Sequence, residues 1–360
     1  MALGPPTLPP RSPLTELASG VDAMYLSGKS QLPASLKADL ETARAEAAGL
    51  GQAVDFEFAG RVWRLAGHGL LKWRYRLDSD VGLVGLTESP SIPTVRVQPR
   101  AELLHAIGPA DAIHVFTEPI ESALERVDWS VSRVDLHSDW QGWELHRDMS
   151  DRFLSRARAR SIYENGDLCT GFTFGRRKGS RITGRIYDKL ADIEVKGNDY
   201  WFDVWGEGFD PALGVHRVEF EWGRAGLRSM QLRTPAQVLD AVGDLWRYST
   251  EDWLSLRTST ADATRARWPV APEWLAIQQS ALNHDLLGIA RLKQGSSKGA
   301  LRLLTPLLNG CVASAAVHLG TADILDTLNA LGPVLRGYER TSGVPFGLRV
   351  DTKRRDREAT

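Results

Sequence analysis

The sequence predicts an α+β fold, with antiparallel sheets that carry helices on one side, and three observations lead to it. Short runs of alternating polar and apolar residues recur along the chain, which is typical of half-buried strands. Along the sequence, several of these runs follow one another and helical segments precede or follow each group, a pattern that favours antiparallel sheets. The opening runs of two groups are similar, which indicates a duplicated unit, and a helical region follows the second unit.

Composition narrows the class of protein. The chain has 360 residues, of which 42% are hydrophobic and 25% charged, as in ordinary globular proteins. A net charge of −1 means that any binding of nucleic acid must come from local patches. Two distant cysteines, Cys169 and Cys311, argue against a disulfide framework and indicate a reducing cytoplasm. Residues 1–17 are rich in proline and lack an apolar run, so we expect a disordered lead and not a secretory signal.

The first predicted unit covers residues 18–128. "LASGVDAMYLSG" (17–28) predicts a strand, and "PASLKADLETARAEAAGLG" (33–51) predicts a helix that starts after proline and ends at glycine. Residues 54–100 contain several strand-like runs, among them "VDFEFAGRVWRLAG" and "PTVRVQP". "AELLHAIG" and "PIESALERV" then predict two short helices.

The second predicted unit covers residues 129–262 and repeats this order. "SRVDLHSDWQGWEL" (132–145) is similar to "SGVDAMYLSG" (19–28), and a helix-like segment that ends near Tyr163 follows. "GFTFGRR", "TGRIYDKL" and "VHRVEFEWG" predict strands, and a helix is expected from about Thr234. Residues 263–345 predict a helical region, in which "LLTPLLNGCVASAAVHLG" is too interrupted to span a membrane and is expected to be a buried helix. Residues 346–360 form a charged tail.

Three predicted strands of the second unit place charged side chains on one face, because successive strand residues point to opposite sides. A solvated surface with cross-strand ion pairs is the ordinary interpretation of such a face. The wall of an active site is the alternative, because carboxylates, cations and a phenol occur together. The residues are Arg133, Asp135, His137 and Asp139 in the first strand, Arg185, Tyr187 and Lys189 in the second, and Arg217, Glu219 and Glu221 in the third.

These residue types suit phosphoryl chemistry. Carboxylate oxygens are preferred ligands of Mg²⁺ or Mn²⁺, and such an ion can polarise a phosphoryl oxygen. A tyrosine with an ordinary pKa of about 10 is a poor nucleophile at neutral pH unless cations favour its phenolate. Arg185 and Lys189 flank Tyr187 at a distance of two residues, so we expect them to act in this way.

A basic segment lies around these strands. Residues 152–185 contain nine lysines and arginines against two acidic residues, which indicates a contact with a phosphate backbone. A solvated helix face and a charged hairpin turn at "GRRKGSR" would explain the same composition. Trp140 and Trp143, close to the strand of Asp135, are candidate stacking platforms for unpaired bases.

The three motifs "RVDLHSD", "TFGRRKGSRITGRIYDKLADIE" and "HRVEFEW" resemble those of the Rep_trans family, the replication initiation factors of rolling-circle plasmids and some phages. That family shows an Arg-x-Asp strand, a "GSR…RIYDK"-like strand and an Arg-x-Glu strand in this order. "GVDAMYLSG" also fits its opening. The resemblance covers roughly residues 18–260, and the helical remainder is poorly matched.

The resemblance implies a metal-dependent DNA-nicking enzyme of the relaxase type. Tyr187 would attack a phosphodiester at a plasmid or phage origin, hold the 5′ phosphate covalently and leave a 3′-OH to prime synthesis. Asp135 and Glu219 match the acidic positions of the family, and Asp139 and Glu221 are further candidate ligands of Mg²⁺ or Mn²⁺. The family also implies a homodimer and a host helicase as partner. The residues expected to contact DNA are Arg133, Arg176, Arg177, Lys178, Arg181, Arg217 and Trp140.

Other functions remain open from the sequence. A DNA-binding regulator of replication or transcription could have the same fold without catalysis, although it would not need Tyr187, Asp135 and Glu219. A metal-dependent nuclease could use water in place of tyrosine, and only the tyrosine enzyme would form a covalent adduct with DNA. An assembly protein is the alternative that the charged face favours least.

Overall fold

The first half of the chain builds one long strand, a helix, a five-stranded meander and two further helices. A computed structural model describes residues 14–176, 180–283, 297–342, 345–348 and 350–351. The long strand β1 begins directly after the first described residue, and the helix α1 ends at Gly51 in a left-handed conformation. The elements are β1 (Thr15–Lys29), α1 (Ala34–Leu50), β2 (Val54–Phe58), β3 (Arg61–Ala66), β4 (Tyr75–Ser79), β5 (Gly82–Leu86), β6 (Val95–Pro99), α2 (Ala101–Ile107) and α3 (Pro109–Leu124).

The second half also begins with a long strand, followed by shorter strands and helices. A capping box at Thr234 starts the helix that the sequence predicts there. The elements are β7 (Asp128–Gln141), α4 (Met149–Arg152), β8 (Phe153–Ser155), β9 (Arg160–Asn165), β10 (Leu168–Phe174), β11 (Ile182–Asp188), α5 (Lys189–Lys196), α6 (Tyr200–Trp205), the 3₁₀ turn η1 (Gly206–Gly208), β12 (Val215–Gly223), α7 (Arg224–Ser229), α8 (Pro235–Asp240), α9 (Val242–Arg247), the π-helical turn η2 (Tyr248–Trp253) and β13 (Leu254–Leu256).

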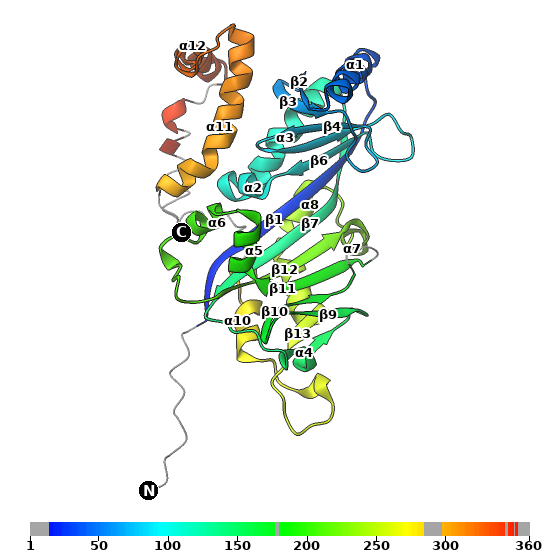
Figure 1. Cartoon of the computed structure of the whole chain (residues 1–360), viewed down its shortest axis with the longest axis vertical. Coiled ribbons are helices and arrows are strands. Elements are labelled where there is room, and N and C mark those ends of the chain that lie inside the picture. The colour runs from blue at the N-terminus through cyan, green and yellow to red at the C-terminus, as the bar shows by residue number, and fades with distance from the viewer. Residues whose placement is uncertain (1–13, 177–179, 284–296, 343–344, 349, 352–360) are drawn as a thin grey trace.

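The C-terminal region is helical, as the sequence predicts. It contains η3 (Arg265–Arg267), α10 (Pro272–Gln278), η4 (Ala281–Asn283), α11 (Ser297–Leu319) and α12 (Ile324–Ser342). Helix α11 contacts α2, α6 and β3, so this region returns to the first half of the molecule (Figure 1). In the described part of the chain no helix has the length and apolarity that crossing a membrane requires.

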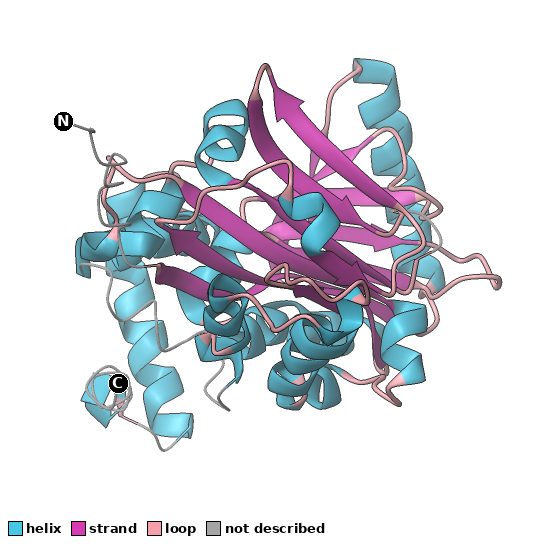
Figure 2. Ribbon diagram, turned by 90° about the horizontal axis from the view of Figure 1, so that it is seen from below, coloured by secondary structure: helices cyan, strands magenta, loops and turns pink. Residues whose placement is uncertain are grey.

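One antiparallel sheet of eleven strands runs through the molecule (Figure 2). Its order is β2-β3-β4-β5-β6-β1-β7-β12-β11-β10-β9, and β13 pairs with β8 in a separate ribbon. The first strands of the two halves, β1 and β7, pair along their whole lengths in the centre, from Thr15 opposite Gln141 to Lys29 opposite Asp128. Each half then extends outward from its own long strand, which is the order that a duplicated unit predicts.

The two faces of the sheet differ in chemistry. Apolar side chains such as Leu26, Leu136 and Phe220 belong to one core cluster that spans both halves. Helices α1 and α3 contact strands of the first half, and α8, α9 and η2 complete the layer over the second half, with the Trp246 ring 5.5 Å from that of Phe220. The α+β fold with a large antiparallel sheet is therefore confirmed, and most of the helices that pack on the sheet lie on this apolar face. Helices α2, α5 and α6 additionally cover one end of the opposite, charged face (Figure 1).

Two local predictions are wrong. The helix expected up to Tyr163 is present only as α4, and Tyr163 belongs to β9, which pairs with β10 through a tight turn at Gly166. Asn165 pairs with Leu168, so Gly166 and Asp167 form a two-residue loop, and the positive φ of 59° at Gly166 fits a hairpin turn that takes glycine at its first central position. This turn chemistry outweighs the helical pattern. Helix α11 forms, but among its described side chains Leu308 and Val317 are more than half exposed, so it is not a buried helix.

Candidate active site on the charged sheet face

Strand register gathers the charged side chains. Arg185 lies opposite Glu219, and Tyr187 lies opposite Arg217, across β11 and β12. On the other side of β12, Glu221 lies opposite Asp135 in β7. Because residues that face each other across paired strands point to the same side of a sheet, all these side chains share one face.

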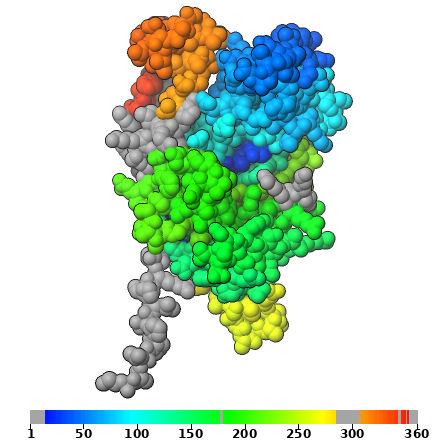
Figure 3. Space-filling view, viewed as in Figure 1, coloured from blue at the N-terminus to red at the C-terminus, as the bar shows by residue number. Residues whose placement is uncertain are grey.

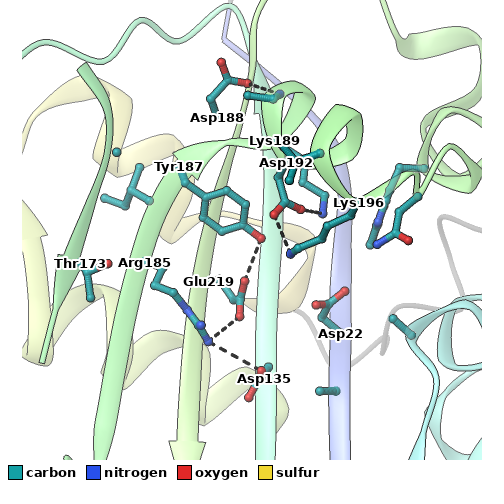
Figure 4. A pocket seen from close by; sticks show the side chains of 18 of the residues that line it. Asp22, Asp135, Thr173, Arg185, Tyr187, Asp188, Lys189, Asp192, Lys196 and Glu219 are labelled. Carbon is teal, nitrogen blue, oxygen red and sulfur yellow. Dashed lines mark hydrogen bonds and ion pairs between the residues drawn. The ribbon is translucent and has the colours of Figure 1, made fainter. Parts of the chain in front are cut away.

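This face forms the floor of a cavity of about 880 Å³, called here the open cavity. Asp22 from β1, Asp135 from β7 and Glu219 from β12 line the floor, and helix α5 forms one wall with Lys189 and Asp192. Figure 3 shows β1 in blue at the bottom of a hollow between the two halves, and Figure 4 shows the side chains that point into it. The size and polarity of the open cavity fit a ligand-binding site.

Tyr187 donates a hydrogen bond from its hydroxyl to Glu219 Oε2 at 3.0 Å (Figure 4). Burial, reinforced by the Glu219 carboxylate, raises the pKa of Tyr187 well above its usual value. The phenol is therefore neutral in this structure and has a proton acceptor in contact. A carboxylate in contact with a phenol is able to accept the phenolic proton.

The two cations expected to favour the Tyr187 phenolate have other partners. Arg185 Nη2 lies 2.8 Å from Glu219 Oε1 and 3.0 Å from Glu221 Oε2. Lys189 does not continue the strand: Asp188 caps the next helix, and Lys189 begins α5 with its Nζ 2.8 Å from Asp192 Oδ2. Lys189 Nζ also lies 5.9 Å from the centroid of the Tyr187 ring, so activation of the phenol by these two cations stays a prediction.

Three carboxylates and two arginines form what we call the carboxylate cluster, made of Asp135, Glu219, Glu221, Arg133 and Arg185. Arg133 Nε donates to Asp135 Oδ1 at 2.7 Å, and Arg133 Nη2 lies 3.0 Å from Glu221 Oε2. Burial raises the pKa of Asp135 to about 7, and the neighbouring carboxylates of Glu219 and Glu221 add to this while Arg133 opposes it. The oxygens suit a divalent cation by type, but in this structure they are engaged by arginines.

Arg217 and Asp139 form a buried ion pair behind this cluster. Both residues are fully buried, with Arg217 Nε 2.6 Å from Asp139 Oδ1. Arg217 Nη1 also contacts Asp22 Oδ1 at 3.1 Å, and the Trp205 indole donates to Asp139 Oδ2 at 2.9 Å. Burial alone would raise the pKa of Asp139, but Arg217 holds it well below its usual range.

This arrangement corrects two predictions. Arg217, expected to contact DNA, is closed off by the Trp201 ring, whose centroid lies 3.9 Å from the guanidinium carbon. Asp139, expected as a metal ligand, has both carboxylate oxygens bound to Arg217. The pair instead fixes β7 to β12 and α6.

A different group of residues has the spacing of a metal site. Within the described ranges, one set of three potential ligands has its donor atoms within 4.8 Å of one another: Asp22, His105 and His137, called here the histidine site. His105 Nε2 lies 3.4 Å from Asp22 Oδ1. Neither ring nitrogen of buried His137 makes a hydrogen bond, and burial, helped by Arg217, lowers its pKa to about 4. The neutral imidazole offers nitrogens that make no hydrogen bond, although its Nδ1 lies 3.5 Å from Asp139 Oδ1 and Arg217 opposes a cation at Asp22.

Sequence reasoning missed Asp22 and His105 as site residues. For Asp22 a signal existed, because "GVDAMYLSG" and "RVDLHSD" carry Val-Asp at matching places, and the two strands pair in the centre of the sheet. His105, in the short helix α2, stands in an ordinary amphipathic pattern and had no such signal.

The predicted DNA contacts fall into three groups. Arg176 and Arg181 are exposed, whereas Arg177 and Lys178 lie outside the described residues. Trp140 is only 4% exposed and belongs to the apolar core, as does Trp143, so neither ring is accessible to a base and this prediction is wrong. The physical reason is strand parity, because Trp140 points to the face opposite Asp139.

A second tyrosine lines the open cavity. Tyr163 of β9 is 53% exposed, and Gly171 of β10 pairs with Tyr163 on one side and Tyr187 on the other. The two tyrosines therefore stand in one row on the same face, separated by a residue without a side chain. Tyr163 has no hydrogen bond to a carboxylate among the described contacts, unlike Tyr187.

Comparison with known proteins gives a similarity in structure but none in sequence. No family model matches this chain, and no curated protein is similar to it in sequence. The structure is similar to that of a rolling-circle replication initiator protein from Geobacillus stearothermophilus, with 16% sequence identity and a TM-score of 0.41. The similarity covers 74% of this chain and 96% of the other. At this TM-score it does not bear on the chemistry of the site.

Proposed function

We propose that the protein is a DNA strand transferase that initiates rolling-circle replication, with Tyr187 as its nucleophile. The hydrogen bond between Tyr187 and Glu219 inside the open cavity is the observation that supports this most. The order of the three sequence motifs points to the same function.

In the proposed reaction Glu219 accepts the phenolic proton while the Tyr187 oxygen attacks a phosphodiester. The bond between the tyrosine oxygen and phosphorus forms, and the bond between phosphorus and the 3′ oxygen breaks. The 3′ oxygen leaves as a hydroxyl after taking up a proton, and the 5′ phosphate stays on Tyr187. Arg185, bound to Glu219 and Glu221, is placed to orient the base and to offset charge on the phosphate.

We further propose that a divalent cation of this reaction binds to Asp22, His105 and His137. The His137 nitrogens, which make no hydrogen bond, support this assignment over the carboxylate cluster, whose oxygens are held by two arginines. Asp22 Oδ1 also contacts an arginine, Arg217, at 3.1 Å, so the assignment depends on the two histidines. A mixed nitrogen and oxygen set suits Mn²⁺ better than Mg²⁺. When bound, the cation would supply positive charge near Tyr187, whose pKa already responds to Asp22.

The test is a search for a covalent adduct. The protein is incubated with Mn²⁺ or Mg²⁺ and two substrates, a supercoiled plasmid library and a pool of random single-stranded oligonucleotides. We expect a 5′-linked oligonucleotide on the peptide that contains Ile186 to Lys189. Tyr187→Phe keeps the packing of the ring, so it should bind DNA normally and form neither adduct nor nick.

Tyr163→Phe is the matched control, because Tyr163 lines the same cavity and should be dispensable. If Tyr187→Phe still forms the covalent adduct and Tyr163→Phe does not, the nucleophile is Tyr163. Nicks without any adduct would favour a nuclease that uses water.

A DNA-binding regulator without catalysis is the second candidate, and one observation favours it. The carboxylates of the cluster are engaged by Arg133 and Arg185, and the phenol of Tyr187 is neutral, so the face is also stable as a purely structural network. Sequence-specific DNA binding with no adduct under either metal would support this candidate. Homodimer formation and recruitment of a helicase remain expectations from the family resemblance.

A further inference from the structure

Two arginines lie on the charged face beyond the carboxylate cluster. Arg96 of β6 is the neighbour of Ser27 in β1, and Ser27 Oγ accepts a hydrogen bond from Arg224 Nη2 at 2.8 Å. Arg224 begins α7, directly after β12. Two residues distant along the sequence are thus both neighbours of Ser27, Arg96 by strand pairing and Arg224 by a hydrogen bond, and we call them the arginine pair.

The arginine pair has no carboxylate partner among the residues that the structure describes. The Arg96 guanidinium donates to the neutral side-chain oxygen of Gln98, and it lies 5.2 Å from the centroid of the Tyr25 ring and 5.1 Å from that of Trp73. Burial lowers the pKa of Arg96; Tyr25 raises it, and the like charges of Arg133 and Arg224 each lower it by a smaller amount. Like charges brought together without an acidic partner cost free energy, which a bound anion would offset.

The pair is continuous with the candidate active site. The Arg133 guanidinium lies 5.1 Å from the centroid of the same Tyr25 ring, and it binds Asp135 and Glu221 on its other side. Tyr25 and Arg133 both line the open cavity. Strands β6, β1 and β7 are adjacent, so the pair lies at most two strands from the carboxylate cluster (Figure 1).

We infer that Arg96 and Arg224 bind a phosphodiester of a single DNA strand whose neighbouring segment occupies the open cavity. This inference rests on the proposed function for the identity of the strand. Arginine forks match phosphate oxygens, and a chain of phosphates would extend from the pair past Arg133 toward Tyr187. The open cavity is larger than one phosphate ion, which favours a strand over free phosphate.

The test measures binding of single-stranded oligonucleotides as a function of salt, in a Tyr187→Phe background where no cleavage is expected. Loss of one phosphate contact should reduce the slope of log K against log salt by about 0.7. We expect this reduction, with about tenfold weaker binding at moderate salt, for Arg96→Gln and separately for Arg224→Gln. Arg224→Gln does not disturb the ring packing of Arg96, so it tests the site even if Arg96→Gln is poorly folded. Arg96→Lys keeps the charge and should keep the slope.

Arg76→Gln is the matched control, because Arg76 lies in β4 of the same sheet but is paired with Asp78 at 3.0 Å. An unchanged slope in both arginine-pair variants would overturn the inference. Inorganic phosphate is added at constant ionic strength as a competitor of the oligonucleotide. If phosphate competes while the salt slopes of both arginine-pair variants are unchanged, the arginine pair is a site for free anions and the inference is overturned. If the wild-type protein nicks DNA but the salt slopes of both arginine-pair variants are unchanged, the proposed nicking stands and only the DNA contact of the arginine pair is rejected. Reduced slopes without any covalent adduct would keep the DNA site and remove the proposed nicking.

Discussion

Asp22 contacts both a candidate metal ligand, His105, and a buried cation, Arg217, and these two contacts determine how the histidine site can be tested. Its carboxylate touches His105 on one side and the buried Arg217 on the other. A neutral amide at this position would leave both contacts possible by hydrogen bonding but would remove the only negative ligand of the histidine site.

We predict that Mn²⁺ stabilises the wild-type protein but not Asp22→Asn. A ligand that binds only the folded state stabilises it by about 2.7 kcal/mol when present at a hundredfold its Kd. The measurement is thermal unfolding with and without Mn²⁺, compared within each variant so that any loss of basal stability cancels. Asp78→Asn, which changes a surface carboxylate, is the control and should respond as wild type. The reverse result, with Asp135→Asn losing the response and Asp22→Asn keeping it, would return the metal to the carboxylate cluster.

At the scale of elements, Gly171 of β10 allows β9, β10 and β11 to pack closely, with Tyr163 and Tyr187 on either side of it. A Cβ atom there would lie 2.5 Å from the Ile186 carbonyl oxygen and 3.1 Å from Tyr187 Cα. Both are backbone atoms, so the clash could be relieved only by moving β10 away from β11. Tyr187 would then shift relative to Glu219, because β11 carries the nucleophile and β12 carries its base.

We predict that Gly171→Ala lowers the free energy of unfolding by about 1–3 kcal/mol, the usual cost of overpacking. Formation of the covalent adduct should fall with it. Gly49→Ala is the control, because Gly49 is exposed near the end of α1 and a Cβ there would meet nothing within 4 Å. That change should be neutral or stabilising by about 0.5–1 kcal/mol. Equal behaviour of the two variants would contradict the close packing of β10 on β11. Denaturant unfolding and the adduct assay give the two readouts.

Elements with a strong local pattern were predictable. Strand β12 alternates charge and bulk over its length, and α1 has start and stop signals, so both follow from sequence alone. The shared face of β7, β11 and β12 also follows from strand parity. Which of its charges are buried does not follow, because α6 covers Arg217 and Asp139 with Trp201 and Trp205, a contact between distant segments. His105 reaches the site for the same reason, through α2.

At the scale of the whole molecule, the two predicted units share one sheet and one core. Val84 of the first half and Phe220 of the second belong to the same buried cluster, and β1 pairs with β7 along its entire length. Neither half therefore buries its central strand without the other.

We predict that residues 18–262 unfold in a single cooperative transition. Circular dichroism and tryptophan fluorescence should give the same midpoint in urea, because no stable intermediate keeps one half folded. A fragment of residues 1–128 should remain unfolded, since β1 would lose its main partner. Two separate midpoints, or a folded fragment, would show that the units are independent domains with the boundaries that the sequence predicts.

The long pairing of β1 with β7 also sets the order of events during synthesis. Lys29 pairs with Asp128 and Thr15 with Gln141, so roughly 100 or more residues lie between partners. At about 5–20 residues per second, the ribosome needs roughly 5–20 seconds to deliver β7 after β1 has emerged. Until then most of β1 is an unpaired edge, since β6 pairs with it only from Leu26 to Gly28. Asp22 lies on β1, so it is synthesised well before His137 on β7. During this time the unpaired edge of β1 can pair with strands of other chains. The nascent chain is most exposed to aggregation in this interval.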